Sequence, residues 1–86
     1  MPRETGQTRR FGVFATVRGW LLAEADRAEV YESRTLAIAT ARRLAHLARW
    51  RGGRAEVLAQ DRAGGTLTVI DPPLGPTDPL VRSESE

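Results

Sequence analysis

Residues 33–53 read SRTLAIATARRLAHLARWRGG, and this stretch decides the fold that we predict for the chain. Placed on a helical wheel at about 100° per residue, its leucines, Ile38 and most of its alanines fill one broad arc, with arginines and His46 on the rest. Ser33 or Thr35 can accept the first free backbone N–H groups, and Gly52 and Gly53 end the pattern. The sequence therefore predicts an amphipathic helix over about residues 35–51.

Before the helix, an alternation of apolar residues predicts a β-hairpin. Residues 11–17 alternate with the period of two that is typical of a strand. Arg18 and Gly19 suit a tight turn, and residues 20–23 form a second short strand. Residues 24–29 read as a polar connection, and Val30 and Tyr31 either extend or re-enter the sheet.

A second hairpin is predicted after the helix. Residues 54–60 alternate so that Ala55, Val57 and Ala59 share one face, residues 61–65 supply turn residues, and residues 66–70 are rich in β-branched side chains. We expect the prolines that follow to prevent further regular structure; they are Pro72, Pro73, Pro76 and Pro79.

These elements predict one α+β domain over residues 10–71, in the order β-β-α-β-β. Residues 1–9 form a flexible basic arm in this interpretation, and residues 72–86 form a Pro-rich, polar, disordered tail. The helix packs on one face of a mainly antiparallel sheet of about four strands. The opposite face, with Phe14, Trp20 and Leu58 as candidate interface residues, either stays wet or meets a partner, most simply a second copy.

Composition excludes several chemistries. The 86 residues include no cysteine and a single histidine, so neither thiolate catalysis nor a familiar metal-ligand set is available. The glycine pairs lack the spacing of a phosphate-binding loop, and the serines lie at the helix start or in the tail. We predict no catalytic residue, cofactor or metal. Without an apolar leader or a long apolar stretch, a cytoplasmic location with no membrane partner is expected.

Positive charge is concentrated on the helix. Residues 34–54 carry six arginines and no acid, although the formal net charge of the chain is only +2. Guanidinium groups bind phosphates in a bidentate manner, so a nucleic-acid or anion contact is one interpretation. The other is an ordinary solvated helix face, with arginine replacing the absent lysine. The candidate contact residues are Arg9, Arg10, Arg42, Arg43, His46 and Arg49.

Four stretches resemble small bacterial β-β-α-β-β domains of unknown function. They are Gly19-Trp20, residues 35–45, Gly53 and the hairpin from Val57 to Ile70, and the resemblance spans about residues 10–71. It implies the fold and assigns no activity, cofactor or site residue.

Two functions follow as expectations. The first is a non-enzymatic interaction module, homodimeric or binding another protein through the sheet face that the helix leaves uncovered. The alternative is a nucleic-acid-binding domain that uses the arginine-rich helix face and the N-terminal arm.

For the remaining aromatic residues, we expect Trp50 to pack over the helix end and Tyr31 to seal the edge of the core.

Overall fold

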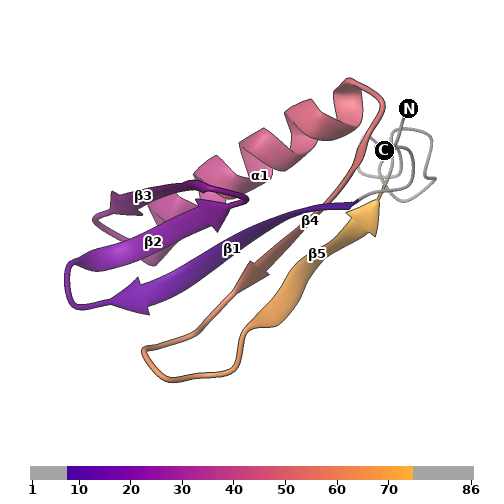
Figure 1. Ribbon diagram of the computed structural model, residues 1–86. Coiled ribbons are helices and arrows are strands. Elements are labelled where there is room, and N and C mark those ends of the chain that lie inside the picture. The colour runs from indigo at the N-terminus through magenta and orange to yellow at the C-terminus, as the bar shows by residue number, and fades with distance from the viewer. Residues whose placement is uncertain (1–7, 75–86) are drawn as a thin grey trace.

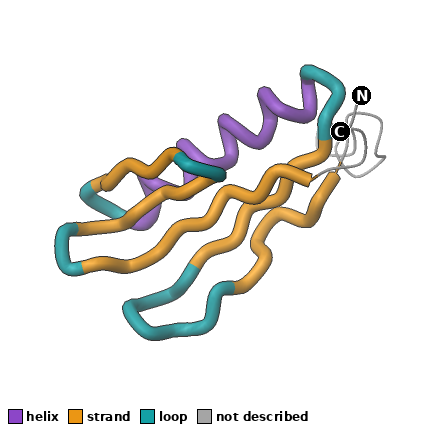
Figure 2. Tube along the Cα trace, viewed as in Figure 1, coloured by secondary structure: helices purple, strands orange, loops and turns teal. Residues whose placement is uncertain are grey.

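In the computed structural model, which describes residues 8–74, five strands form one sheet and a single helix packs on one of its faces (Figures 1 and 2). The α+β class is confirmed, and the sheet is mostly antiparallel as predicted, but it has five strands and includes one parallel pair. Its strand order is β3-β2-β1-β4-β5. The elements are β1 (Thr8–Thr16), β2 (Gly19–Glu24), β3 (Arg27–Tyr31), α1 (Arg34–Trp50), β4 (Arg54–Ala59) and β5 (Thr68–Leu74).

Strand β3 was predicted only at its end: Val30 and Tyr31 belong to the sheet, as one reading of the sequence had it, but the strand begins at Arg27. It pairs antiparallel with β2, with Leu22 opposite Glu29, and occupies one edge of the sheet. Four of its five residues are exposed, so the apolar alternation that identifies a half-buried strand is absent. Of the predicted polar connection over residues 24–29, only Ala25 and Asp26 lie between strands, because Glu24 belongs to β2 and β3 begins at Arg27.

The two halves of the sheet are joined by a parallel pair. Strand β1 runs antiparallel to β2 and parallel to β4, with Phe11 opposite Val57. The connection between β1 and β4 includes β3 and α1, and a parallel pair requires a crossover of this kind. As predicted, Ala55, Val57 and Ala59 share the face that α1 covers, where all three are buried.

Helix α1 begins where the sequence predicted. The Ser33 hydroxyl accepts the backbone N–H of Leu36 at 3.1 Å, so Ser33 is the N-cap. The buried stripe consists of alanines, however, and the three leucines of the predicted buried arc are between 37% and 48% exposed. Alanine permits the close approach that centres the helix on this stripe, which leaves the leucines on one flank. The stripe is Ala37, Ala41, Ala45 and Ala48; the leucines are Leu36, Leu44 and Leu47.

Strand β5 extends through two prolines, contrary to the prediction that regular structure stops before them. It lies at the other edge of the sheet, and its pairing with β4 shifts register twice, so a missing N–H is tolerated. The Pro73 carbonyl accepts a hydrogen bond from Arg54 Nη2 at 2.7 Å.

Strand β1 begins at Thr8, so Arg9 also belongs to the sheet. The rest of the predicted arm and tail, residues 1–7 and 75–86, lies outside the described residues.

Candidate functional site

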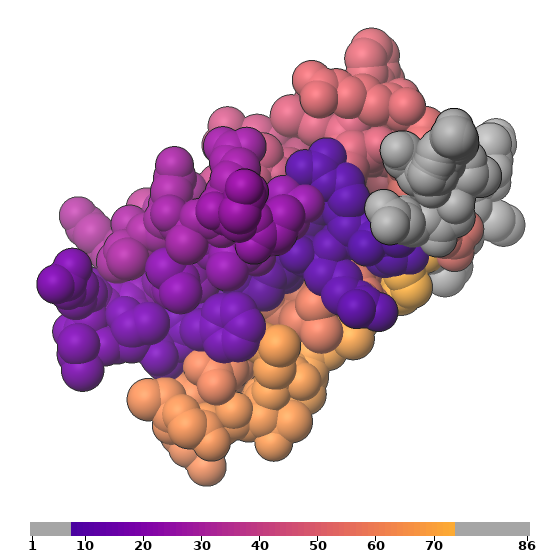
Figure 3. Space-filling model, viewed as in Figure 1, coloured from indigo at the N-terminus to yellow at the C-terminus, as the bar shows by residue number. Residues whose placement is uncertain are grey.

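The sheet face opposite α1, called the open face below, carries a cluster of apolar side chains. The strand pairing places them together, since directly opposite residues point to the same side. A shallow hollow of about 480 Å³ lies in this face, lined in part by Phe14, Leu58 and Leu67. The space-filling view shows the β1–β2 hairpin lying against the β4–β5 hairpin (Figure 3). The paired apolar residues of the open face are Phe14, Leu21, Val30, Leu58 and Val69.

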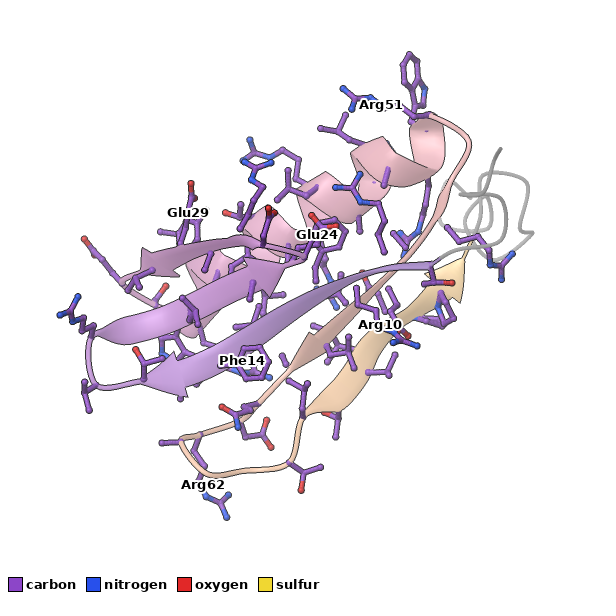
Figure 4. All side chains as sticks on the ribbon, viewed as in Figure 1. Arg10, Phe14, Glu24, Glu29, Arg51 and Arg62 are labelled. Carbon is purple, nitrogen blue, oxygen red and sulfur yellow. The ribbon has the colours of Figure 1, made fainter. Side chains whose placement is uncertain are left out.

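Gly12 determines where the Phe14 ring lies. A Cβ atom at Gly12 would be 2.8 Å from Cε1 of Phe14 and 3.1 Å from its Cζ, so the ring occupies the space above the glycine. Figure 4 shows Phe14 projecting from β1. The ring therefore lies along the strand, where it covers buried Gly12 and presents its other side to solvent.

One ion pair crosses the open face. Arg10 Nε donates to Glu56 Oε2 at 2.6 Å, with the Glu56 side chain only 10% exposed and the Arg10 side chain 73% exposed. The two charges neutralise each other next to the apolar hollow, which both residues line. Arg10, one of the predicted anion contacts, thus has a partner within the sheet.

Of the three predicted interface residues, Phe14 and Leu58 lie on the open face and Trp20 does not. Trp20 is opposite Ala15 on β1 and packs against the core on the face that α1 covers. Tyr31 packs there too, as predicted. The prediction that Trp50 packs over the helix end is wrong, because its side chain is 78% exposed.

The structure separates the six candidate anion contacts. Arg49, which the helical wheel placed on the solvent side, is buried, and its Nη2 donates to the Ala55 carbonyl at 2.7 Å and to the Pro72 carbonyl at 3.3 Å. Arg42 forms an ion pair with Asp71 at 3.2 Å. Arg43 and His46 are exposed on the outer side of α1.

Arg9 forms a bidentate ion pair with Glu24 on the neighbouring strand β2. Its Nε and Nη2 donate to the two carboxylate oxygens of Glu24 at 2.9 and 3.0 Å. The hydrogen bonds from Arg9 hold the pKa of Glu24 below its ordinary value, and in turn raise the pKa of Arg9. The Arg9 guanidinium also lies 5.4 Å from the ring centroid of Phe11, within the range of a cation–π contact.

A second concavity, called the hairpin groove below, lies between α1 and the β2–β3 hairpin on the covered side of the sheet. Its volume is about 210 Å³. Phe11 and Leu22 line it from the sheet, and Leu44 and Leu47 line it from the helix. The sequence pattern did not reveal this groove. The width of the apolar arc of the helix could have indicated it. The alanine stripe alone covers the sheet, so the leucines beside the stripe remain partly exposed.

Some of the charged side chains that line the hairpin groove form hydrogen bonds with other described residues, and others do not. Glu24 is held by Arg9, and Glu29 Oε1 accepts the hydroxyl of Tyr31 at 2.7 Å, a hydrogen bond that raises the pKa of Tyr31. Figure 4 shows Glu24 and Glu29 on the β2–β3 hairpin and Arg51 at the end of the helix. Among residues 8–74, the guanidinium groups of Arg27 and Arg51 form no hydrogen bond or ion pair.

Comparison with known proteins found no family model, no curated protein and no solved structure that matches the chain. Within the described part of the chain, no three His, Cys, Asp or Glu side chains are grouped so that they could hold a metal ion. None of the helices in that part is long and apolar enough to cross a membrane.

Proposed function

We propose that the chain is a non-enzymatic interaction module that forms a homodimer through its open face. The observation that carries this proposal is the shallow apolar hollow around Phe14 and Leu58, which nothing among the described residues covers. Removal of such a surface from water is the main favourable term in protein association. A second copy supplies a surface of the same shape and polarity.

The sheet edges are poorer places to associate. Strand β5 carries Pro72 and Pro73 and two register shifts, and the side chains of Arg27 and Glu29 charge the edge strand β3. Proline, irregular pairing and charge are the devices by which sheet edges avoid pairing with other chains. Packing of face against face uses neither edge.

Electrostatics also permit two open faces to meet. The Arg10–Glu56 pair neutralises itself, so two copies would bring two neutral pairs together and not two like charges. Five strands spaced by about 4.8 Å span roughly 19 Å, and six residues of strand about 20 Å. A face of that size, about 380 Å² per partner, is smaller than the roughly 800 Å² per partner of standard stable interfaces, so the contact is a weak one. The proposed dimer should therefore depend on concentration.

Sedimentation velocity over a range of concentrations tests this proposal. Wild-type chain should shift from monomer toward dimer as concentration rises, whereas Leu58→Glu should stay monomeric. The matched control is Val17→Glu, which adds the same charge at a fully exposed turn position and should dimerise as wild type does. Far-ultraviolet circular dichroism would establish that both variants fold. If Leu58→Glu does not fold, Phe14→Gln takes its place; a wild type that remains monomeric at every concentration contradicts the proposal.

Nucleic-acid binding, the alternative, has weaker support. Arg9, Arg10, Arg42 and Arg49 each bind a group within the protein, which leaves Arg43 and His46 on the exposed helix surface. Its test is a titration with duplex and single-stranded oligonucleotides over a series of salt concentrations. Several phosphate contacts would produce a steep loss of affinity with salt, and Arg43→Ala would weaken binding at low salt.

A further inference from the structure

We propose that the hairpin groove binds a peptide segment of a partner protein, in which one large apolar side chain is flanked by acidic residues. The groove and the open face lie on opposite sides of the sheet. This proposal therefore does not depend on the homodimer, and either can fail without the other.

The apolar part of the ligand follows from the lining of the groove. Phe11 and Leu22 are buried beneath it, whereas Leu44 and Leu47 on α1 remain 37% and 39% exposed. Leucines in this position lack the contacts that a fully packed core residue makes, and a guest side chain would supply them. The volume of about 210 Å³ is below the roughly 300–1,000 Å³ of pockets that enclose whole small molecules. It suits a single large side chain.

The acidic part follows from which charges are already paired. Glu24 is paired with Arg9, whereas the Glu29 carboxylate accepts only the neutral hydroxyl of Tyr31 and keeps its negative charge. Arg27 on β3 and Arg51 at the end of α1 line the same groove. Neither guanidinium forms an ion pair with another described residue, although the charge of Arg27, which lies opposite Glu24, helps Arg9 to lower the pKa of Glu24. Three arginines (Arg9, Arg27 and Arg51) therefore line the groove against two carboxylates (Glu24 and Glu29), and the net charge of its lining is +1. Acidic residues beside the apolar side chain would balance this excess positive charge and give Arg27 and Arg51 carboxylate partners.

A random dodecapeptide library displayed on phage, selected against the full chain, tests the proposal. We expect enriched sequences with a leucine or aromatic residue flanked by aspartate or glutamate. Selection against the double variant Arg27→Glu, Arg51→Glu should replace the acidic flanks by basic ones. An absence of enrichment, or flanks that do not change with the charge reversal, overturns the proposal. Enrichment of sequences that match residues 78–84 of this chain would also overturn it, in favour of a ligand within the chain.

A synthetic peptide with the selected sequence then locates the site. Its affinity for the chain should fall at least tenfold in Leu44→Ser, while Leu36→Ser should bind as wild type does. Leu36 is a matched control because it lies on the same helix flank, is 48% exposed and does not line the groove. Equal losses in the two variants would place the peptide elsewhere. Amide chemical shifts of the folded chain would report both the site and the integrity of each variant.

Discussion

The guanidinium of Arg49 donates a hydrogen bond to the backbone carbonyl of Ala55 across the loop that joins α1 to β4, with 2.7 Å between Nη2 and O. The same nitrogen reaches the Pro72 carbonyl on β5 at 3.3 Å. One buried side chain thus connects the helix, the adjacent strand and the edge strand. Arg49 therefore has a structural role, although the sequence places it among the candidate anion contacts.

Replacement of this arginine should destabilise the protein. Arg49→Leu keeps the apolar stem but leaves carbonyls of Ala55 and Pro72 without this donor, a loss of about 2 kcal/mol in the free energy of unfolding. The control is Arg43→Leu on the exposed side of the same helix, for which we expect a change within about 0.5 kcal/mol. Urea denaturation measures both. Equal effects of the two substitutions would contradict the structural role of Arg49.

Gly12→Ala should act through the ring of Phe14. The added Cβ would lie 2.8 Å from the ring, so the ring must move away from the strand and lose its contact there. We expect a loss of about 1 kcal/mol in stability in the wild-type background. In a Phe14→Ala background the same substitution meets no ring and should cost little. A double-mutant cycle by chemical denaturation measures this coupling, and additive effects would argue against it.

The Arg9–Glu24 pair should make stability depend on acidity. Because the pKa of folded Glu24 lies below its ordinary value of 4.5, the carboxylate contributes its full stability above that pH and loses it as the pH falls through the folded pKa. Thermal melts of wild type and Glu24→Gln, measured from neutral to acidic pH, should differ most at neutral pH and converge in acid. A difference that stays constant with pH would exclude this carboxylate as the cause.

Tyr31 is the only tyrosine in the chain, so its ionisation can be followed by the ultraviolet absorbance of the phenolate. The hydrogen bond to Glu29 raises its pKa above 10.0, and the midpoint of the titration should lie above that value. The contact stabilises the fold below pH 10 and is lost as the pH rises through the folded pKa. Glu29→Gln should move the midpoint back toward 10.0, whereas Glu32→Gln, one residue from Tyr31 and without this contact, should shift it much less.

The parts of the fold that could be predicted are those in which one side of an element is buried. The helix cap at Ser33 and the inward-facing Ala55, Val57 and Ala59 follow from hydroxyl capping and from alternation, and both are confirmed. The first three residues of strand β3 could not be predicted, because Arg27, Ala28 and Glu29 are all exposed at the sheet edge and show no apolar pattern. This strand is held at the edge of the sheet by its backbone pairing with β2.

The candidate surfaces were predicted less completely. A helical wheel assigns arginine to solvent by polarity, yet the long side chain of Arg49 turns inward and its charge is satisfied by backbone carbonyls. Phe14 and Leu58 could be assigned to the uncovered face from alternation. The hairpin groove could not be predicted from the sequence. It depends on the distance between the helix and β3, and the packing of the alanine stripe sets that distance.

The parallel pairing of β1 with β4 has a consequence for how the chain folds. The pairs β1–β2, β2–β3 and β4–β5 join strands that are neighbours in sequence, whereas β1 must meet β4 across 46 residues, as between Phe11 and Val57. Closure of so long a loop loses chain entropy before any contact compensates for it. The meeting of these two strands should therefore be the slow step, and sequence changes that favour it should accelerate refolding more than changes within either hairpin.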